Sequence, residues 1–191
     1  MIKSVKYYKE NVLNRDLVLK HRFVNVMQTP RVEKVSLSLN KKEALLNSNK
    51  LFVPLLLLKI ISGQKPCVVK SKKSVAQFKL REGKALGGRI TLRKTNLYTF
   101  IDKFIYTILP QLVEDKNKRF KVNHNVITFG IEDISIFPEL DSQYELLKVT
   151  QGINIAISLT NSQKILSYSF FKGIKFPVQE KKIPKYLSKG E

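Results

Sequence analysis

Residues 63–93 read GQKPCVVKSKKSVAQFKLREGKALGGRITLR, and they hold nine lysines and arginines against one glutamate. The start, CVVKSK, is rich in β-branched residues, and the end, GRITLR, alternates apolar and polar side chains, so both ends are predicted to be strands. The middle contains three glycines and no helical apolar stripe. Loops of about 15 residues without their own structure are usually functional or disordered. We therefore predict a long basic loop, which like-charge repulsion keeps from folding on itself and which a polyanion would order.

The residue types within this loop suit RNA. A base can stack on Phe78, and Arg81 can bind a phosphate through two hydrogen bonds. Glycines 83, 87 and 88 permit positive φ and close backbone approach. Unpaired loops and bends are what proteins read in RNA, so the loop is predicted to contact RNA.

The composition of the whole chain also indicates a polyanionic partner. The chain has 191 residues, a formal net charge of +20 and 43% hydrophobic residues. That is enough apolar material for one domain, placed at residues 1–177, followed by a basic tail at 178–191 that is predicted to be disordered. The positive net charge favours binding to the phosphate backbone of a nucleic acid or to an anionic membrane surface. The longest apolar run, residues 51–61, is too short to span a bilayer, and no membrane partner is predicted.

The sequence contains no recognisable catalytic or metal-binding motif. Its single cysteine, Cys67, excludes an internal disulfide and a cysteine-clustered metal site, and we expect it to be a small buried hydrophobe. His21 and His124 have no metal-ligand spacing and no Ser/Asp partner pattern, so both are expected at the surface or facing RNA. We predict no metal, no cofactor and no enzymatic activity; a nuclease would need acid–base pairs that the sequence does not supply.

The elements before the basic stretch are predicted from periodicity. Residues 4–22 form a helix with Ser4 as its N-cap, and residues 23–30 form a short strand. Residues 31–40 alternate strictly near their end, so one face is buried and Ser36, Ser38 and Asn40 point the other way. A helix lies within residues 43–61, capped near residues 47–48 and closed by Gly63.

The elements predicted after the basic stretch determine the expected fold class. Residues 97–112 form the clearest helix, with a cap at Thr95 or Asn96 and an end at Pro110. Residues 126–131 and 152–159 are strands, and residues 162–174 are a short helix. Strands and helices mix without a βαβ period. This predicts an α+β fold with a largely antiparallel sheet, helices packed on one side, and the basic loop between two strands.

The basic stretch closely resembles the large-subunit ribosomal protein L5 family in its universal, bacterial-type form. The resemblance extends through YYKENV, NVMQTPRVEKV, LYTFIDKFI, FGIEDISIFPE, GINIAI and KGIKFP, which covers nearly the whole chain up to Pro177. It implies a structural protein that binds 5S ribosomal RNA in the central protuberance. It further implies contacts with large-subunit ribosomal RNA, neighbouring large-subunit proteins, peptidyl-site transfer RNA and a small-subunit head protein across the subunit bridge.

The resemblance also implies which residues make these contacts. The expected 5S contact comprises Asn25, Gln28, Ser36, Ser38, Gln64, Lys65, Lys70, Phe78, Thr91 and Arg93. The expected transfer-RNA-facing loop comprises Lys72, Lys73, Ser74, Gln77, Lys79 and Arg81. Charge and glycine content alone point to the same loop, whereas Gln64 and Thr91 follow only from the family.

The chain departs from the family in ways that bear on its source. The family's Asn-x-Gly-x-Gly pattern is replaced by Ser38, Asn40 and Lys42, and a serine cannot form the paired contact of an amide. Lys, Asn, Ile and Leu are abundant, as an AT-rich genome imposes. We therefore expect a mitochondrion-encoded protein of the mitochondrial large subunit, with the bacterial cytoplasm or a plastid as alternatives. The rival function is a free-standing RNA chaperone or annealing protein that uses the same basic surface.

Overall fold

A single six-stranded sheet organises the molecule. The computed structural model describes residues 4–21, 23, 25–40, 51–78, 80–116, 120–143, 152–160 and 164–178. The strand order is β2-β3-β1-β6-β5-β4, and neighbouring strands pair antiparallel throughout. The strands are β1 (Arg31–Asn40), β2 (Cys67–Lys70), β3 (Ala85–Leu92), β4 (Val122–Asn123), β5 (Val126–Ile131) and β6 (Ile153–Thr160). The predicted α+β class with a largely antiparallel sheet is confirmed.

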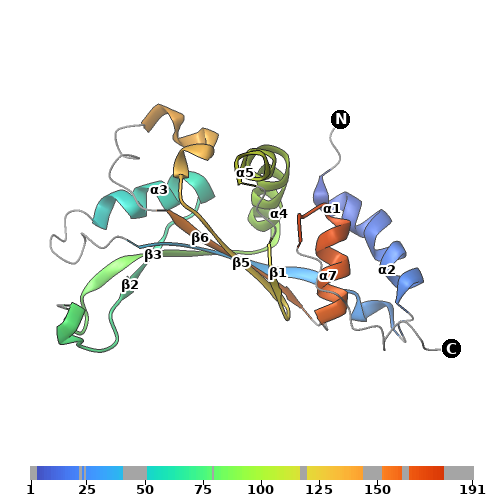
Figure 1. The fold of residues 1–191 in the computed structure, drawn as a ribbon, viewed down its shortest axis with the longest axis horizontal. Helices are drawn as coiled ribbons and strands as arrows, with labels where there is room; N and C mark the ends of the chain where they lie inside the picture. The colour runs from blue at the N-terminus through green and yellow to red at the C-terminus, as the bar shows by residue number, and fades with distance from the viewer. Residues whose placement is uncertain are drawn as a thin grey trace.

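The helices pack along one side and one end of this sheet. In Figure 1, α3, α4 and α5 lie above the sheet, and α1, α2 and α7 stand at its right-hand end. The α-helices are α1 (Val5–Tyr8), α2 (Asn14–Lys20), α3 (Phe52–Ser62), α4 (Lys94–Lys103), α5 (Leu109–Lys116) and α7 (Lys164–Gly173). The π turns are η1 (Lys9–Leu13) and η6 (Phe104–Ile108), and the 3₁₀ turns are η2 (Val26–Gln28), η5 (Ala76–Phe78), η7 (Ile134–Ile136) and η8 (Pro138–Gln143).

The alternation in β1 divides the sheet into two faces. Val35, Leu37 and Leu39 are fully buried beneath the helices, while Ser36 and Ser38 lie on the opposite face. At the neighbouring strand, a Cβ on Gly88 would lie 2.8 Å from the side chains of two leucines of α3. Gly88 therefore lets α3 sit directly on β3. Of the three glycines singled out for positive φ or close approach, Gly83 has positive φ (76°), whereas Gly87 and Gly88 lie inside β3 at close approaches to neighbouring atoms.

The predicted N-terminal helix exists, although it is not regular throughout. It runs from α1 through the π turn η1 into α2, and it ends at Lys20. Ser4 is its N-cap, as predicted, with its hydroxyl accepting from the Lys6 N–H at 3.3 Å. The Asp102 carboxylate accepts from the Val5 N–H at 2.7 Å and from the Ser4 hydroxyl at 3.0 Å. Helix α1 is thus tied to α4 at its positive end, where a carboxylate is stabilising.

The long central helix does not end at Pro110, contrary to the prediction. It runs from α4 through the π turn η6 into α5, with Pro110 as the second residue of α5. The Leu109 N–H bonds to the Phe104 carbonyl, the wider spacing of a π turn. Because the ladder is already widened just before the proline, the missing proline N–H does not stop the helix. The helix also begins one residue before the expected caps, at Lys94, with Arg93 as N-cap.

An aromatic cluster joins this helix to the sheet and to the end of the described chain. The Phe104 ring lies 5.3 Å from Phe129 of β5 and 5.6 Å from Phe176, measured between ring centroids. Phe120 lies 4.6 Å from Phe129. These separations are those of favourable aromatic pairs. The cluster seals the helix side of β5 and leaves the other side of that strand open.

Two further expectations are contradicted by the structure, and a third is tested in part. Residues 26–28 form a 3₁₀ turn rather than part of a strand, and the side chain of Asn25, whose backbone is extended, caps this turn. Cys67 is exposed rather than buried. The helix α3 ends at Gly63 as predicted, but its expected cap at residues 47–48 lies outside the described residues, as do residues 179–191 of the tail.

Candidate RNA interface

The face of the sheet turned away from the helices gathers small polar side chains. The register pairs Ser36 of β1 with Thr91 of β3, and Ser38 with Arg89. On the other side of β1, Ser38 pairs with Asn154 of β6. Residues directly opposite on antiparallel strands share a face. We call the surface made by Ser36, Ser38, Asn40, Arg89, Thr91, Thr128, Asn154 and Ala156 the open face.

The open face is hollowed into a shallow groove. Its lining comes from five strands and consists of Ser36, Ser38, Asn40, Val69, Arg89, Thr128, Phe129, Gly130, Asn154, Ile155 and Ala156. Among these lining residues Arg89 is the single charged side chain. The groove floor is therefore a neutral, hydrogen-bonding surface with one guanidinium. Such a floor can bind sugars and phosphates closely, and it can hold one phosphate through the guanidinium fork.

Several predicted 5S residues lie on or beside this face. Ser36, Ser38 and Thr91 are half-buried within it, where their hydroxyls remain accessible. Arg93 is exposed just after β3, and its extended backbone (φ −142°, ψ 166°) continues the alternation that places it with Thr91. Gln64 and Lys65 are exposed in the connection from α3 to β2, and Lys70 is exposed at the far end of β2.

Two predicted residues are not brought to the open face. Asn25 and Gln28 belong to the η2 turn, which precedes β1 at the end of the sheet nearest α7 in Figure 1. The Asn25 side-chain oxygen accepts from the Met27 N–H at 2.9 Å, so it is engaged in its own turn. The opposite end of the sheet carries the β2–β3 connection. Asn25 and Gln28 thus form a separate exposed surface.

The basic loop between β2 and β3 is folded, contrary to the expectation that its charge prevents this. The Ser71 N–H bonds to the Lys84 carbonyl at 2.8 Å, and Val75 and Leu80 exchange two backbone hydrogen bonds at 3.0 and 3.1 Å. The Glu82 N–H also donates to the Ser74 hydroxyl at 3.0 Å. Because backbone pairing within a hairpin keeps the cationic side chains apart on its outside, the repulsion that we invoked is not decisive. The loop is a hairpin that extends from the sheet.

The predicted transfer-RNA residues lie along this hairpin. Lys72, Lys73, Ser74, Gln77 and Arg81 are all exposed on it. Lys79 and the side chain of Phe78 lie outside the described residues, so the predicted stacking on Phe78 stays a prediction. The hairpin is carried at the β2 edge of the sheet, at the left in Figure 1.

Sequence reasoning missed part of the open face. Arg89 was counted among the basic residues but not assigned to the site, although the alternation of GRITLR places it with Thr91. Asn154 and Thr128 each stand between apolar residues of a predicted strand, so alternation could have placed both on the face away from the core. That they lie beside Ser36 and Ser38 follows from the pairing of β6 with β1 and of β5 with β6, which is a matter of topology.

The histidines do not form a catalytic site. The His21 Nε2 atom lies 3.0 Å from the Ser169 hydroxyl of α7, and partial burial lowers the pKa of the imidazole. His21 is therefore half-buried against α7, and the expectation that it lies at the surface or faces RNA stays a prediction. His124 is exposed in the β4–β5 turn. Within the described residues, no group of histidine, cysteine or acidic side chains is arranged to hold a metal, and no helix is long and apolar enough to cross a membrane.

Comparison with known proteins identifies relatives along almost the entire chain. Residues 25–81 match the family model described as ribosomal protein L5, and residues 85–178 match the model for the C-terminus of the same ribosomal protein family. The large ribosomal subunit protein uL5m of Reclinomonas americana is 33% identical over 93% of this chain and 98% of its own length. The uL5 protein of Pediococcus pentosaceus is 38% identical over 78% of this chain and 83% of its own. The uL5 protein of Dichelobacter nodosus is 34% identical over 93% and 98%.

Proposed function

The chain belongs to the ribosomal protein L5 family of structural, non-enzymatic large-subunit proteins, and we propose that its open face binds 5S ribosomal RNA. The observation that carries the proposal is the register that sets Ser36 beside Thr91 and Ser38 beside Arg89. Small hydroxyl side chains let an RNA backbone approach closely. RNA also offers 2′-hydroxyls that both donate and accept hydrogen bonds.

The charges around the open face fit a division between positioning and recognition. Lys65, Lys70 and Arg93 are exposed beyond the groove floor, where they can neutralise phosphates. The floor itself carries Arg89 as its single charge among the lining residues. Phosphate contacts at the margin position the RNA, and neutral contacts on the floor select its shape.

Substitution of two polar residues tests the 5S proposal. Thr91→Ala and Gln64→Ala each remove one neutral hydrogen-bonding side chain, which is worth about 1 kcal/mol or about fivefold in affinity. We expect each variant to weaken 5S binding by that amount in filter binding at fixed salt. Thr99→Ala and Gln111→Ala, which truncate exposed residues on α4 and α5, are the matched controls. Unchanged affinity in both test variants would remove these residues from the interface.

We also propose that the β2–β3 hairpin contacts transfer RNA in the peptidyl site. The hairpin that carries these exposed cations lies at the β2 edge of the sheet. A small-subunit head protein is a further proposed partner, taken from the family alone.

A free-standing RNA chaperone would use the same charge without a selective face. It would bind many RNAs alike, and Thr91→Ala would leave its annealing activity unchanged. We further propose that the protein works in a mitochondrial ribosome, which the Reclinomonas americana relative and the AT-type composition support. Isolating the native complex and sequencing its RNA tests both proposals, because ribosomal RNA of identifiable origin would co-purify.

A further inference from the structure

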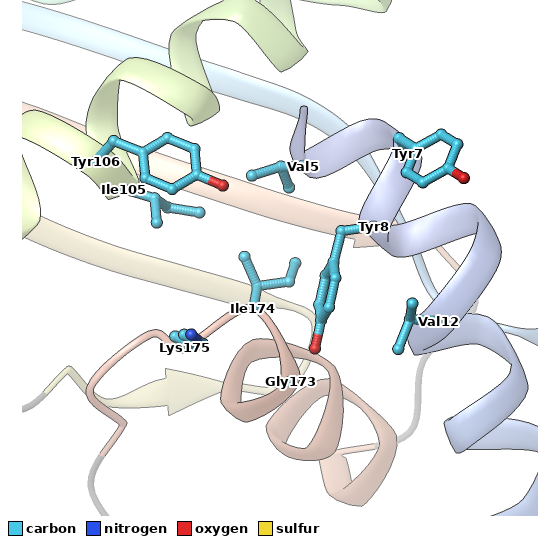
Figure 2. Close-up of a pocket in the computed structure, with 9 residues that line it drawn as sticks. All are labelled: Val5, Tyr7, Tyr8, Val12, Ile105, Tyr106, Gly173, Ile174 and Lys175. Carbon is cyan, nitrogen blue, oxygen red and sulfur yellow. The ribbon is translucent and has the colours of Figure 1, made fainter. Parts of the chain in front are cut away.

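A second hollow lies far from the open face, among the helices. It is formed where α1 and η1 meet the π turn η6 and the end of α7, as Figure 2 shows. Its lining consists of Val5, Tyr7, Tyr8, Val12, Ile105, Tyr106, Gly173, Ile174 and Lys175. We call it the tyrosine groove. It contains the YY of YYKENV, a motif that the 5S proposal leaves without a role.

The accessible surface of the tyrosine groove is largely aromatic. The floor residues Val5 and Ile174 are 6% and 7% exposed, so they offer little to a partner. Tyr8 is 37% exposed and Tyr106 is 49% exposed. In Figure 2 these two side chains stand on either side of the hollow, with the Tyr106 hydroxyl directed across it. Val12 is also 43% exposed, so a flat ring entering the hollow would meet tyrosine side chains and one aliphatic side chain.

The walls of the tyrosine groove are held in place before any ligand arrives. The Asp102 carboxylate ties the start of α1 to α4, which continues into η6 and so fixes the two walls relative to each other. Gly173 faces Leu13 so closely that a Cβ there would collide with the leucine side chain. The end of α7 is therefore locked against η1. A site fixed in this way does not have to order its walls when a ligand binds.

The charge at the rim is positive. Lys175 is exposed and is the single charged residue of the nine that line the groove. Its φ of 64° lies in the left-handed region, where a lysine is strained and glycine or asparagine would fit more easily. Figure 2 shows its side chain beside Ile174 at the edge of the hollow. A cation is thus placed at an unfavourable backbone position next to aromatic walls.

We propose that the tyrosine groove binds one unpaired nucleotide of ribosomal RNA, with the base against Tyr8 and Tyr106 and the phosphate at Lys175. The proposal rests on the proposed function as an RNA-binding ribosomal protein. Aromatic side chains with a neighbouring cation are how proteins hold splayed-out bases. A docking protein helix would need a buried apolar pocket, whereas Val5 and Ile174 are almost fully covered and Val12 is the single aliphatic side chain among the lining residues that is more than 40% exposed. The observations therefore favour RNA over a protein partner.

Binding of a short single-stranded oligouridylate to the full chain tests this inference. Fluorescence anisotropy at fixed salt should show that Tyr8→Leu weakens binding about five- to hundredfold, the range for losing one base–aromatic stack. Tyr8→Phe keeps the ring and should bind as the wild type does. Tyr106→Leu should weaken binding similarly, and it gives a second reading because Tyr106 is half exposed and its truncation spares the core. Tyr168→Leu on α7 is the matched control outside the groove.

Crosslinking sharpens the result. A photoreactive 4-thiouridine oligonucleotide should crosslink to the peptides that carry Tyr8 and Tyr106. Unchanged oligonucleotide affinity in folded Tyr8→Leu and Tyr106→Leu would overturn the inference, as would an equal loss in Tyr8→Phe. The inference would also be overturned if ribosomes carrying Tyr8→Leu or Tyr106→Leu lost a neighbouring ribosomal protein while the contact with RNA stayed intact. Filter binding of 5S RNA to the wild type separates the two proposals: if the wild type fails to bind, the proposed function falls, and if it binds while the tyrosine variants lose nothing, only this inference falls.

Discussion

The open face and the β2–β3 hairpin are neighbours on one sheet, yet they are built for different tasks. The open face lies over the central strands β1 and β6, backed by fully buried side chains such as Leu37 and Leu39. The hairpin lies beyond the edge strand β2, held by a few backbone hydrogen bonds and surrounded by exposed cations. The face offers neutral groups at set positions, whereas the hairpin offers charge. Rigid backing suits recognition of shape, and an exposed cationic extension suits a partner that arrives and leaves.

The largest effect should come from removing the hairpin's charge. Replacing Lys72, Lys73, Lys79 and Arg81 with alanine should spare assembly of the large subunit and weaken its hold on peptidyl-site transfer RNA. The loss should be roughly tenfold or more at physiological salt, because up to four phosphate contacts disappear. Reconstituted subunits, assayed for 5S content and for transfer-RNA binding, measure both quantities.

A control for this variant replaces four exposed cations of the helices, Arg15, Lys20, Lys59 and Lys94, and should leave both quantities near wild type. The division of labour is wrong if the hairpin variant loses 5S incorporation while transfer-RNA binding per intact subunit stays normal.

Substitutions at two glycines compare how much β3 and the hairpin each contribute to the stability of the fold. In β3, a Cβ on Gly87 would collide with the Leu39 carbonyl and with Asn40, so Gly87→Ala should lower the free energy of unfolding by about 1–3 kcal/mol. In the hairpin, Gly83 has φ 76° and open space around it, so Gly83→Ala should strain the hairpin locally by about 1 kcal/mol. Urea unfolding should therefore show a clear midpoint shift for Gly87→Ala and a smaller one for Gly83→Ala. Equal shifts would mean that the hairpin is as integral to the fold as β3.

The salt dependence of 5S binding separates neutral from charged contacts. Lys70→Gln should reduce the slope of log affinity against log salt by about 0.7–0.9, the contribution of one phosphate contact. Thr91→Ala should displace the line by about fivefold without changing its slope, since a neutral hydrogen bond releases no counterion. Filter binding across a salt series measures both. A change of slope in Thr91→Ala would show that the open face does not bind through neutral contacts alone.

The smallest expected effect is a change in the pH dependence of stability at His21, which belongs to neither the open face nor the hairpin. Burial lowers the pKa of His21 below its ordinary value of 6.5, whereas the unfolded chain keeps that value. As the pH falls below about 6.5, the unfolded state takes up a proton at His21 before the folded state does. The free energy of unfolding therefore decreases as the pH falls from 6.5 to the lower pKa of the folded state. Between pH 7 and pH 5 the wild type should lose slightly more thermal stability than His21→Gln. An identical pH dependence in the two proteins would show that His21 does not titrate with folding.

The parts of the molecule that could be predicted are those with local signals. The alternation in residues 31–40 predicted both β1 and the polar face of Ser36 and Ser38, and Ser4 was recognisable as an N-cap. The failures were at places where neighbouring elements decide. Pro110 continues a helix because a π turn precedes it, and the packing of Gly88 against α3 depends on where that helix lies. Asn154 and Thr128 reach the open face through strand pairing that no local pattern encodes.

The pairing of β1 with β6 also governs when the protein can complete its fold. The Thr160 hydroxyl bonds to the Arg31 carbonyl across 129 positions of sequence, and β1 is paired with β6 from Arg31 to Ser38 with one register shift. During translation, β2 and β3 can join β1 early, but β1 keeps one bare hydrogen-bonding edge until β6 has been synthesised. Bare strand edges are sites of intermolecular pairing, and such distant contacts form slowly. A chain that stalls before residue 152 would therefore expose an unpaired strand edge that is prone to aggregation, so folding without aggregation depends on uninterrupted synthesis of the segment from residue 152 onward.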